Sequence, residues 1–411
     1  MSLSTTRLVV AADEEGGWDY GTDRGPYSTF HIANGAKYCV YNNRLMPVTQ
    51  KVDRIDGYWA LRQTAALFDT GERPIEIKGP DAEKLANKVF TRNISNLKPG
   101  RAAYSLLCYP NGTLLCDGVL LRFEADHFWY VQADGPVFSW LVAQSEGLDV
   151  EISDPRSWVA QVQGPASLDI LNELVEGGVP DDFRYFAVRR ARIKGQDVVI
   201  TRTGWTNELG FEFYTLPKEA NYEGEGLWRA VLEAGRRHGL QVSGLDSMEI
   251  RRIEAGILNN GSDFDDSFTP FDAGLGAYVD FSKDHFIGRS ALETAHREPR
   301  LIGLISKSGE PLRQSRVTAN SKDLGFVTAA AYSPYLEAGI AIVRLNEPIA
   351  EGARVTVTGR DLKPHAAVLS NLPLYDKDKK IPRGLAVEIP KRPSVALQRS
   401  PERARPFAAR S

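Results

Sequence analysis

The 411-residue sequence has few cysteines, little net charge and no long apolar run. Its three cysteines, at positions 39, 108 and 116, are too few and too scattered for a disulfide framework or a cysteine-rich zinc site. None of the six histidines has a partner at metal-binding spacing, so we expect no metal. A formal net charge of −3 provides no basic field for nucleic acid, and no apolar stretch is long enough to span a bilayer.

What remains is a globular protein of ordinary composition, with 42% apolar and 25% charged residues. A short apolar stretch near the N-terminus is interrupted by Asp13, Glu14 and Glu15, which is not typical of a signal peptide. We therefore expect a cytoplasmic protein that binds neither nucleic acid nor membrane and is a monomer or a homodimer. Its length predicts two or three domains rather than one core.

Two segments, 77–90 and 162–175, repeat one pattern. Each ends an alternating strand at Gly-Pro and then opens a helix with apolar residues at three- and four-residue spacing. Proline suits the first helical turn, where its missing N–H has no partner anyway. Two unrelated strand–helix junctions are the alternative, but register and residue types both repeat, which favours an internal duplication.

Strands and helices are mixed around these segments without a parallel α/β order. Residues 118–131 predict a hairpin, residues 187–214 predict more hairpin, and helices are expected at about 225–239 and 244–257. This pattern predicts an α+β fold. From Leu301 onward, short strands between glycine- and proline-containing turns predict a small β-barrel, and after Asp376 a basic tail with several prolines is expected to be mobile or to lie along the surface.

Two acids are candidates for chemistry. Asp117 follows an apolar strand and precedes Gly118, so it is either a positioned proton donor or acceptor, or a turn aspartate that bonds its own backbone. Spacing alone favours the turn. Glu212 lies on the second arm of a strand–turn–strand over 198–214, where a half-buried carboxylate needs donors. A cross-strand ion pair with Arg202 would also supply them.

Segments 111–118, 198–214 and 251–256 occur in a fixed order that resembles the glycine-cleavage T-protein family of tetrahydrofolate-dependent one-carbon transferases. The resemblance covers roughly residues 30–375. It implies a three-domain cloverleaf of two related α+β domains and a C-terminal β-barrel. The implied domains are 1–71 with 155–250 for the first, folate-binding one, 72–154 with 251–298 for the second, 299–375 for the barrel, and 376–411 for the tail.

The resemblance also assigns site residues. Asp117 falls on the catalytic acid beside the reactive folate nitrogens, Tyr104 on a folate-contacting tyrosine, and Glu212 on the acid that holds the pterin ring. Cys116 replaces the first acid of the family's pair. The further positions implied to contact tetrahydrofolate are Gln132, Tyr185, Trp205 and Arg252, although an ordinary helix-surface charge is the alternative for Arg252.

Within that family, segments 38–48, 202–207 and 256–265 look more like folate-dependent demethylases such as dimethylsulfoniopropionate demethylase. Met248 replaces an arginine of the glycine-cleavage site. We therefore expect methyl transfer from a small sulfonium, ammonium or methoxy compound to N5 of tetrahydrofolate. Trp205, Trp129 or Tyr130 could contact a cationic donor, or could simply pack in a core.

Two other functions stay open. One is an aminomethyltransferase of a glycine-cleavage-like system that forms 5,10-methylenetetrahydrofolate. The other is a non-enzymatic folate-binding relative, which should carry a cysteine signature in place of the catalytic acid. Cys116 beside Asp117 does not match that signature well.

Overall fold

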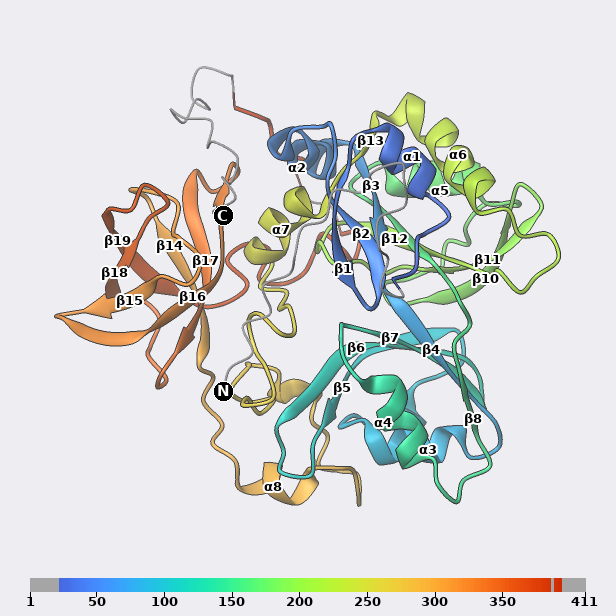
Figure 1. Ribbon diagram of the computed structural model, residues 1–411, viewed down its shortest axis with the longest axis horizontal. Coiled ribbons are helices and arrows are strands. Elements are labelled where there is room, and N and C mark those ends of the chain that lie inside the picture. The colour runs from blue at the N-terminus through green and yellow to red at the C-terminus, as the bar shows by residue number, and fades with distance from the viewer. Residues whose placement is uncertain (1–21, 386–387, 394–411) are drawn as a thin grey trace.

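The computed structural model describes residues 22–385 and 388–393. Within these ranges two α+β units lie side by side, and a barrel lies beyond them at one end of the long axis (Figure 1). No helix in the described part of the chain is long and apolar enough to cross a bilayer.

The first unit is built on a six-stranded sheet of order β10-β11-β12-β9-β3-β13, which is antiparallel except where β13 pairs parallel with β3. Helices α5 and α6 share an apolar core with this sheet, to which Ile170 and Trp228 contribute. The bounds are β3 Ala65–Thr70, β9 Val159–Gln163, β10 Val188–Ile193, β11 Gln196–Thr201, β12 Gly210–Thr215, β13 Leu240–Val242, α5 Ser167–Leu174 and α6 Gly224–Gly235, the last followed by a short 3-10 turn at Arg236–His238.

The second unit is built on a five-stranded antiparallel sheet of order β5-β6-β7-β4-β8. Helices α3 and α4 lie along one face of it, where Leu85 and Leu141 join the strand residues in a second core (Figure 1). The bounds are β4 Arg73–Lys78, β5 Arg101–Cys108, β6 Leu114–Glu124, β7 His127–Gln132, β8 Glu151–Ser153, α3 Ala82–Val89, a 3-10 turn at Ile94–Asn96 and α4 Val137–Gln144. The predicted hairpin over 118–131 is confirmed.

The two sheets meet through a third apolar cluster. Leu121 and Trp129 of the second sheet are buried there with Val199 and Tyr214 of the first. Of the polar residues that the resemblance assigned to the site, Tyr104, Asp117 and Gln132 lie on strands of the second sheet and Glu212 on a strand of the first. This contact between the sheets fixes the relative positions of those strands.

The two Gly-Pro junctions have the same geometry. Gly79 lies between β4 and α3, and Gly164 lies between β9 and α5, with φ of +139° and +126°. A Cβ on either would lie 2.7 Å from a carbonyl oxygen, that of Asp149 or that of Thr64. Only glycine accepts this backbone and this close approach. The matched geometry is what an internal duplication predicts.

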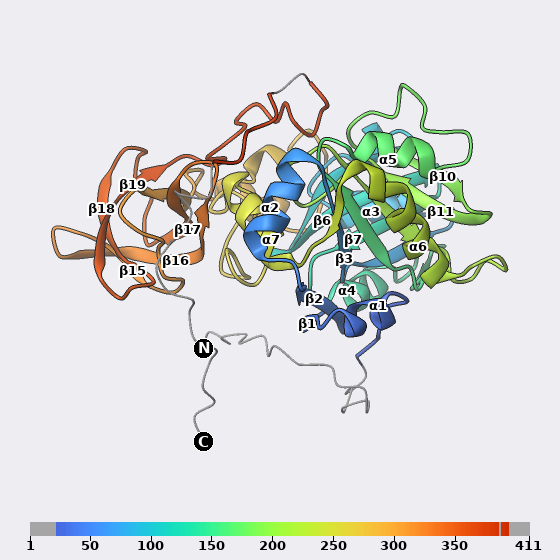
Figure 2. The same cartoon turned by 90° about the horizontal axis from the view of Figure 1, so that it is seen from above.

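The C-terminal strands close into a barrel of order β14-β17-β16-β15-β18-β19, which Figures 1 and 2 show beside the two units. Together with the two mixed units, this barrel confirms the predicted three-domain α+β architecture. Its strands are β14 Leu301–Ser306, β15 Arg316–Ala319, β16 Lys322–Ser333, β17 Ala338–Leu345, β18 Arg354–Thr358 and β19 Pro364–Ser370. The domain boundaries given above stay a prediction.

The remaining elements connect these parts. A two-stranded ribbon of β1 and β2 precedes α2, which packs on α7, and α7 in turn packs on β16 of the barrel. The predicted helix over 244–257 is therefore confirmed as α7. The bounds are α1 Ser28–Ala33, β1 Lys37–Tyr41, β2 Arg44–Thr49, α2 Arg54–Gln63, α7 Leu245–Glu254, a 3-10 turn at Gly276–Tyr278 and α8 Arg289–Thr294.

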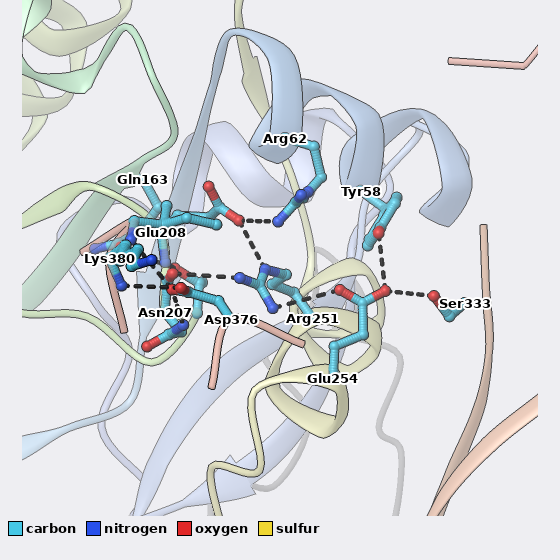
Figure 3. A network of polar contacts seen from close by, with 12 residues as sticks. Tyr58, Arg62, Gln163, Asn207, Glu208, Arg251, Glu254, Ser333, Asp376 and Lys380 are labelled. Carbon is cyan, nitrogen blue, oxygen red and sulfur yellow. Dashed lines mark hydrogen bonds and ion pairs between the residues drawn. The ribbon is translucent and has the colours of Figure 1, made fainter. Parts of the chain in front are cut away.

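A buried polar network around α7 joins the parts of the molecule (Figure 3). Glu254 Oε1 accepts a 2.6 Å hydrogen bond from Ser333 of the barrel, and Glu254 Oε2 lies 3.4 Å from Arg251 Nη1. Arg251 Nε donates to Glu208 in the turn before β12 at 2.7 Å, and Glu208 also accepts from Arg62 of α2 at 2.5 Å. Each charge is paired, as burial requires.

The described part of the tail lies along the first unit rather than apart from it. The side chain of Asn207 donates to Asp376 at 3.0 Å, and the side chain of Gln63 donates to the carbonyl of Pro390 at 2.8 Å. Of the two expectations for the tail, a surface course is the one seen in residues 376–385 and 388–393. Residues 386–387 and 394–411 of the predicted tail lie outside the described ranges.

Candidate functional site

Asp117 lies within β6, not in a turn, so the turn interpretation is wrong. Tyr104 lies on the neighbouring strand β5, two residues before Leu106, which faces Asp117 in the register. Its hydroxyl donates to Asp117 Oδ2 at 2.7 Å, while Oδ1 is buried without a partner among the described residues. Burial, and to a smaller extent the charge of Asp263, raise the pKa of Asp117 to about 6, although the hydrogen bond from Tyr104 counteracts this in part. Burial also raises the pKa of Tyr104 well above its usual value, so this hydroxyl remains a donor.

Glu212 lies on β12 opposite Thr201 of β11 and is held by hydroxyl and amide donors. It accepts from Gln161 at 2.8 Å, from Thr203 at 2.5 Å and from Tyr214 at 2.7 Å. The alternative ion pair with Arg202 is not formed, because that guanidinium donates to backbone carbonyls instead. Burial raises the pKa of Glu212, and the neutral donors counteract this only in part.

Glu72 is a second carboxylate at this place, and sequence reasoning missed it. The amide nitrogen of Gln161 that donates to Glu212 also lies 3.3 Å from Glu72 Oε1. Glu72 Oε2 is buried without a partner among the described residues. Burial, and then the charge of Glu212, raise the pKa of Glu72 to about 8. Because Glu72 and Glu212 share the amide donor of Gln161, the pair is more stable when one of the two carboxyl groups is protonated.

Arg252 is 1% exposed, so the helix-surface interpretation is wrong. Its guanidinium donates to Asp263 at 2.6 Å and to Glu249 at 2.5 Å and 2.7 Å, and it lies 5.2 Å from the ring centroid of Trp205. With its nitrogens engaged in this way, Arg252 orients Asp263 and Trp205. Direct contact between Arg252 and a ligand stays a prediction.

The contacts of Arg252 and Gln161 link several of these residues. The negative charge of Asp263 contributes to the raised pKa of Asp117. Asp263 in turn forms an ion pair with Arg252, whose guanidinium lies over the ring of Trp205. The backbone N–H of Trp205 is directed to the side chain of Gln161 at 3.5 Å, and Gln161 donates to Glu212. Asp263, Arg252, Trp205, Gln161 and Glu212 are thus linked by contacts, and Asp117 lies within electrostatic range of Asp263. A single ligand site that includes both Asp117 and Glu212 stays a prediction.

Gln132 and Tyr185 complete the set of predicted contacts. Gln132, the last residue of β7, lies opposite Gly118 in the strand register, and its Oε1 is buried without a partner among the described residues. Burial raises the pKa of Tyr185 to about 12, with a smaller contribution from Tyr278. Contact between Tyr185 and a ligand stays a prediction. Tyr278, missed from sequence, packs edge-on to Tyr104 at 4.8 Å between centroids.

Trp129 and Tyr130 lie in cores instead. Trp129 donates its indole N–H to Glu76 and packs in the cluster between the sheets, and Tyr130 is fully buried with its hydroxyl on the Ser105 carbonyl. Both are packing residues, so their suggested contact with a cationic donor is wrong. Cys116 is also buried, which raises the pKa of its thiol and disfavours a nucleophilic thiolate.

The orphaned oxygens indicate what the site can bind. Asp117 Oδ1, Gln132 Oε1 and Glu72 Oε2 are buried acceptors without donors from the described residues. A buried acceptor without a donor is costly, so such atoms fit a ligand that carries several N–H groups. A pterin ring offers an N–H and an NH₂ side by side, which suits paired carboxylates. No cluster of three potential metal ligands occurs among the described residues.

Comparison with known proteins assigns the family. Residues 28–283 match the model of the GCVT N-terminal domain, and residues 300–376 match that of the glycine cleavage T-protein C-terminal barrel domain. The chain belongs to the glycine-cleavage T-protein family. Its members are tetrahydrofolate-dependent one-carbon transferases, so this T-protein relative is an enzyme with tetrahydrofolate as its cofactor.

Individual relatives agree with this assignment. An aminomethyltransferase of Streptomyces coelicolor is 35% identical over 367 residues, covering 85% of this chain and 96% of that protein. The trimethylamine-oxide aldolase of Ruegeria pomeroyi is 33% identical over 350 residues, which are 80% of this chain but only 44% of that protein. The crystal structure of aminomethyltransferase T from Bartonella henselae superimposes with a TM-score of 0.77 at 25% identity, covering 86% of this chain and 98% of that one.

Proposed function

We propose that this T-protein relative transfers a methyl group from a small methylated donor to N5 of tetrahydrofolate. The observation that carries the proposal is the hydrogen bond from Tyr104 to the buried Asp117, together with the neutral donors that hold the buried Glu212. When bound, tetrahydrofolate supplies the nitrogen that accepts the one-carbon unit.

The side chains divide the work. Glu212 and Glu72 receive the N–H groups of the pterin ring, and Gln132 offers one more acceptor. Asp117, ionised above about pH 6, accepts or returns the proton of the folate nitrogens and favours positive charge beside it. Tyr104 holds the carboxylate in place through its hydroxyl. Burial of both acids excludes water, and fixed reactants need less reorganisation to react.

The proposed class of methyl donor is argued from Met248. This side chain is 1% exposed and packs with Leu61, Ala66 and Phe68, where the glycine-cleavage proteins carry an arginine. An apolar residue there removes a cation that would serve an anionic or carrier-bound substrate. Trp205 supplies an aromatic surface, although the guanidinium of Arg252 already lies over its ring. A small sulfonium, ammonium or methoxy compound fits this site.

The alternative is an aminomethyltransferase that forms 5,10-methylenetetrahydrofolate. It is supported at least as well, because the Streptomyces coelicolor and Moorella thermoacetica relatives and the Bartonella henselae structure all carry that name. The two functions share the folate site and differ in the product that leaves it.

The product therefore decides between them. The protein is incubated with tetrahydrofolate and dimethylsulfoniopropionate, glycine betaine, dimethylglycine, vanillate or syringate in turn, and folates are analysed by mass spectrometry. 5-Methyltetrahydrofolate from one donor establishes the demethylase and names its substrate. 5,10-Methylenetetrahydrofolate overturns methyl transfer in favour of the alternative. Loss of folate binding in Glu212→Ala, with Glu233→Ala as an exposed control, tests the site independently of the donor.

A further inference from the structure

A cavity of about 900 Å³ is lined by residues other than those assigned to tetrahydrofolate, although Arg44 in its lining donates to the backbone carbonyl of Glu72. It is bordered by the N-terminal ends of β2 and β4, by the connection from β8 to β9, and by the chain just after β12. The residues that line it are Asp23, Arg24, Arg44, Arg73, Asp154, Arg156, Trp158, Pro217 and Lys218. Neither Asp117 nor Glu212 borders it.

Arg44 forms the innermost part of this lining and is incompletely satisfied. It is 1% exposed, and its Nη1 donates to the carbonyls of Glu72 and Ser157, each at 2.7 Å. The Cζ of its guanidinium lies over the ring of Trp158, 4.0 Å from the centroid. Its Nε is buried and has no partner among the described residues. The two carbonyls and the aromatic ring orient this guanidinium, and no carboxylate in the described part of the chain forms an ion pair with it.

The charges around Arg44 are unbalanced. Five cationic side chains and two carboxylates line the cavity, an excess of three positive charges. Both carboxylates form ion pairs with Arg73: the nitrogen-to-oxygen distance is 2.6 Å for Asp154 and 3.6 Å for Asp23.

Three of the other cationic side chains that line the cavity have no carboxylate partner in the described part of the chain. Arg24, Arg156 and Lys218 are exposed and form no ion pair within the described part of the chain. Burial, and then the charge of Arg73, lower the pKa of Arg44 to about 10, although the charges of Asp154, Asp23 and Asp69 counteract this in part. A concave surface with one sign of charge concentrates ions of the opposite sign.

We propose that this cavity is a binding site for a small molecule with two or more carboxylate or phosphate groups. An arginine held over a tryptophan ring, with an Nε that has no partner among the described residues, is suited to a planar carboxylate or to a phosphate, because two parallel N–H donors match two oxygens. The exposed cations at the rim attract the remaining negative charge. The inference does not depend on the identity of the methyl donor.

The test measures binding of citrate and of inorganic pyrophosphate to the full-length protein by isothermal titration calorimetry at constant ionic strength. The rim variant is Arg156→Asn with Lys218→Ala; asparagine is chosen because Arg156 has a φ of +57°, which asparagine tolerates. The matched control is Arg189→Asn with Arg190→Ala, which removes two exposed cations from β10. A third variant, Arg44→Met, removes the inner guanidinium, with its fold checked by circular dichroism.

We expect one equivalent of at least one probe to bind. The rim variant should weaken binding by about tenfold or more, since it loses charge-assisted contacts, and the control should stay within about twofold. The better of the two probes tells carboxylate from phosphate. Absence of saturable binding by both probes overturns the proposal, as does equal weakening in the rim variant and its control. If Arg44→Met does not fold, the rim variant alone decides.

Discussion

At the scale of single residues, Asp117 combines burial with one oxygen held by Tyr104 and one left free. Asp117→Asn keeps the shape and removes the proton acceptor. We expect the turnover number to fall by roughly 10²–10⁴ while tetrahydrofolate still binds within a few-fold of its original affinity. Single-turnover kinetics with folate binding by fluorescence separates the two effects.

The neighbouring Cys116→Ser variant serves as the control and should keep most of its activity, because burial already disfavours the thiolate. In the unmodified enzyme, kcat/KM should rise as pH increases through about 6, where the carboxylate of Asp117 forms. A profile that falls over that range, or an active Asp117→Asn enzyme, contradicts the assigned role.

Glu72 gives a prediction about stability and pH. Its folded-state pKa of about 8 is raised above the unfolded value, so its contribution to stability is fully present below about pH 4.3 and is lost as pH rises toward 8. Glu72→Gln removes that loss. Its free energy of unfolding relative to the unmodified protein should therefore increase by at least about 1 kcal/mol between pH 5 and pH 8. Urea unfolding at the two pH values measures the difference.

Glu76 is a control of the opposite sign. Hydrogen bonds from His127 and then from Trp129 and Ser153 lower its pKa to about 2 despite its partial burial. Its contribution is present above about pH 4.3 and is lost as pH falls, so Glu76→Gln should destabilise the protein equally at pH 5 and pH 8. If both variants behave alike, the raised pKa of Glu72 is contradicted.

Sequence patterns found Asp117, Tyr104 and Glu212 but not Glu72 or Asp263. The first three lie in segments whose residue order resembles a known family. Glu72 is recognised only through its contact with Gln161, which lies on a strand far along the chain. Asp263 is recognised only through its contacts with Arg252 and Thr328. Periodicity predicts on which face of a strand a residue lies, but not which distant segment of the chain packs against that face.

At the scale of elements, a side chain in place of the glycine at a strand–glycine–helix junction should strain the backbone, and this can be measured. In Gly164→Ala the new Cβ meets the Thr64 carbonyl at 2.7 Å, and the backbone has a φ of +126°. We expect a loss of about 3 kcal/mol in the free energy of unfolding. Gly177→Ala, with φ +80° and open space around it, should cost about 1 kcal/mol from backbone strain alone. Chemical denaturation compares the two variants.

The elements themselves were largely predictable. The hairpin of β6 and β7, the helices α6 and α7 and the Gly-Pro junctions followed from alternation, helical spacing and turn residues. The course of the tail did not, because its contacts depend on single hydrogen bonds such as that from Asn207 to Asp376. A basic, proline-containing composition is compatible with either a mobile or a docked segment.

At the scale of the whole molecule, the barrel is tied to the site through Asp263. Thr328 of β16 donates to Asp263 at 2.6 Å in a fully buried position. Thr328→Val leaves that carboxylate short of one donor and should lower the free energy of unfolding by about 1–3 kcal/mol. The exposed Thr356→Val on β18 is the control, with an expected change within about 0.5 kcal/mol. Equal thermal stability of the two variants contradicts the coupling of barrel and site.

The discontinuous first sheet also has a consequence for synthesis on the ribosome. Strand β3 ends at Thr70, but its antiparallel partner β9 starts only at Val159, after every strand of the second sheet. At the usual pace of translation, these roughly ninety residues take about 5–18 s to emerge. During that time β3, all six residues of which are buried in the finished fold, has no partner within its own sheet. The nascent chain is therefore most exposed to aggregation after its second sheet is complete and before its first can form.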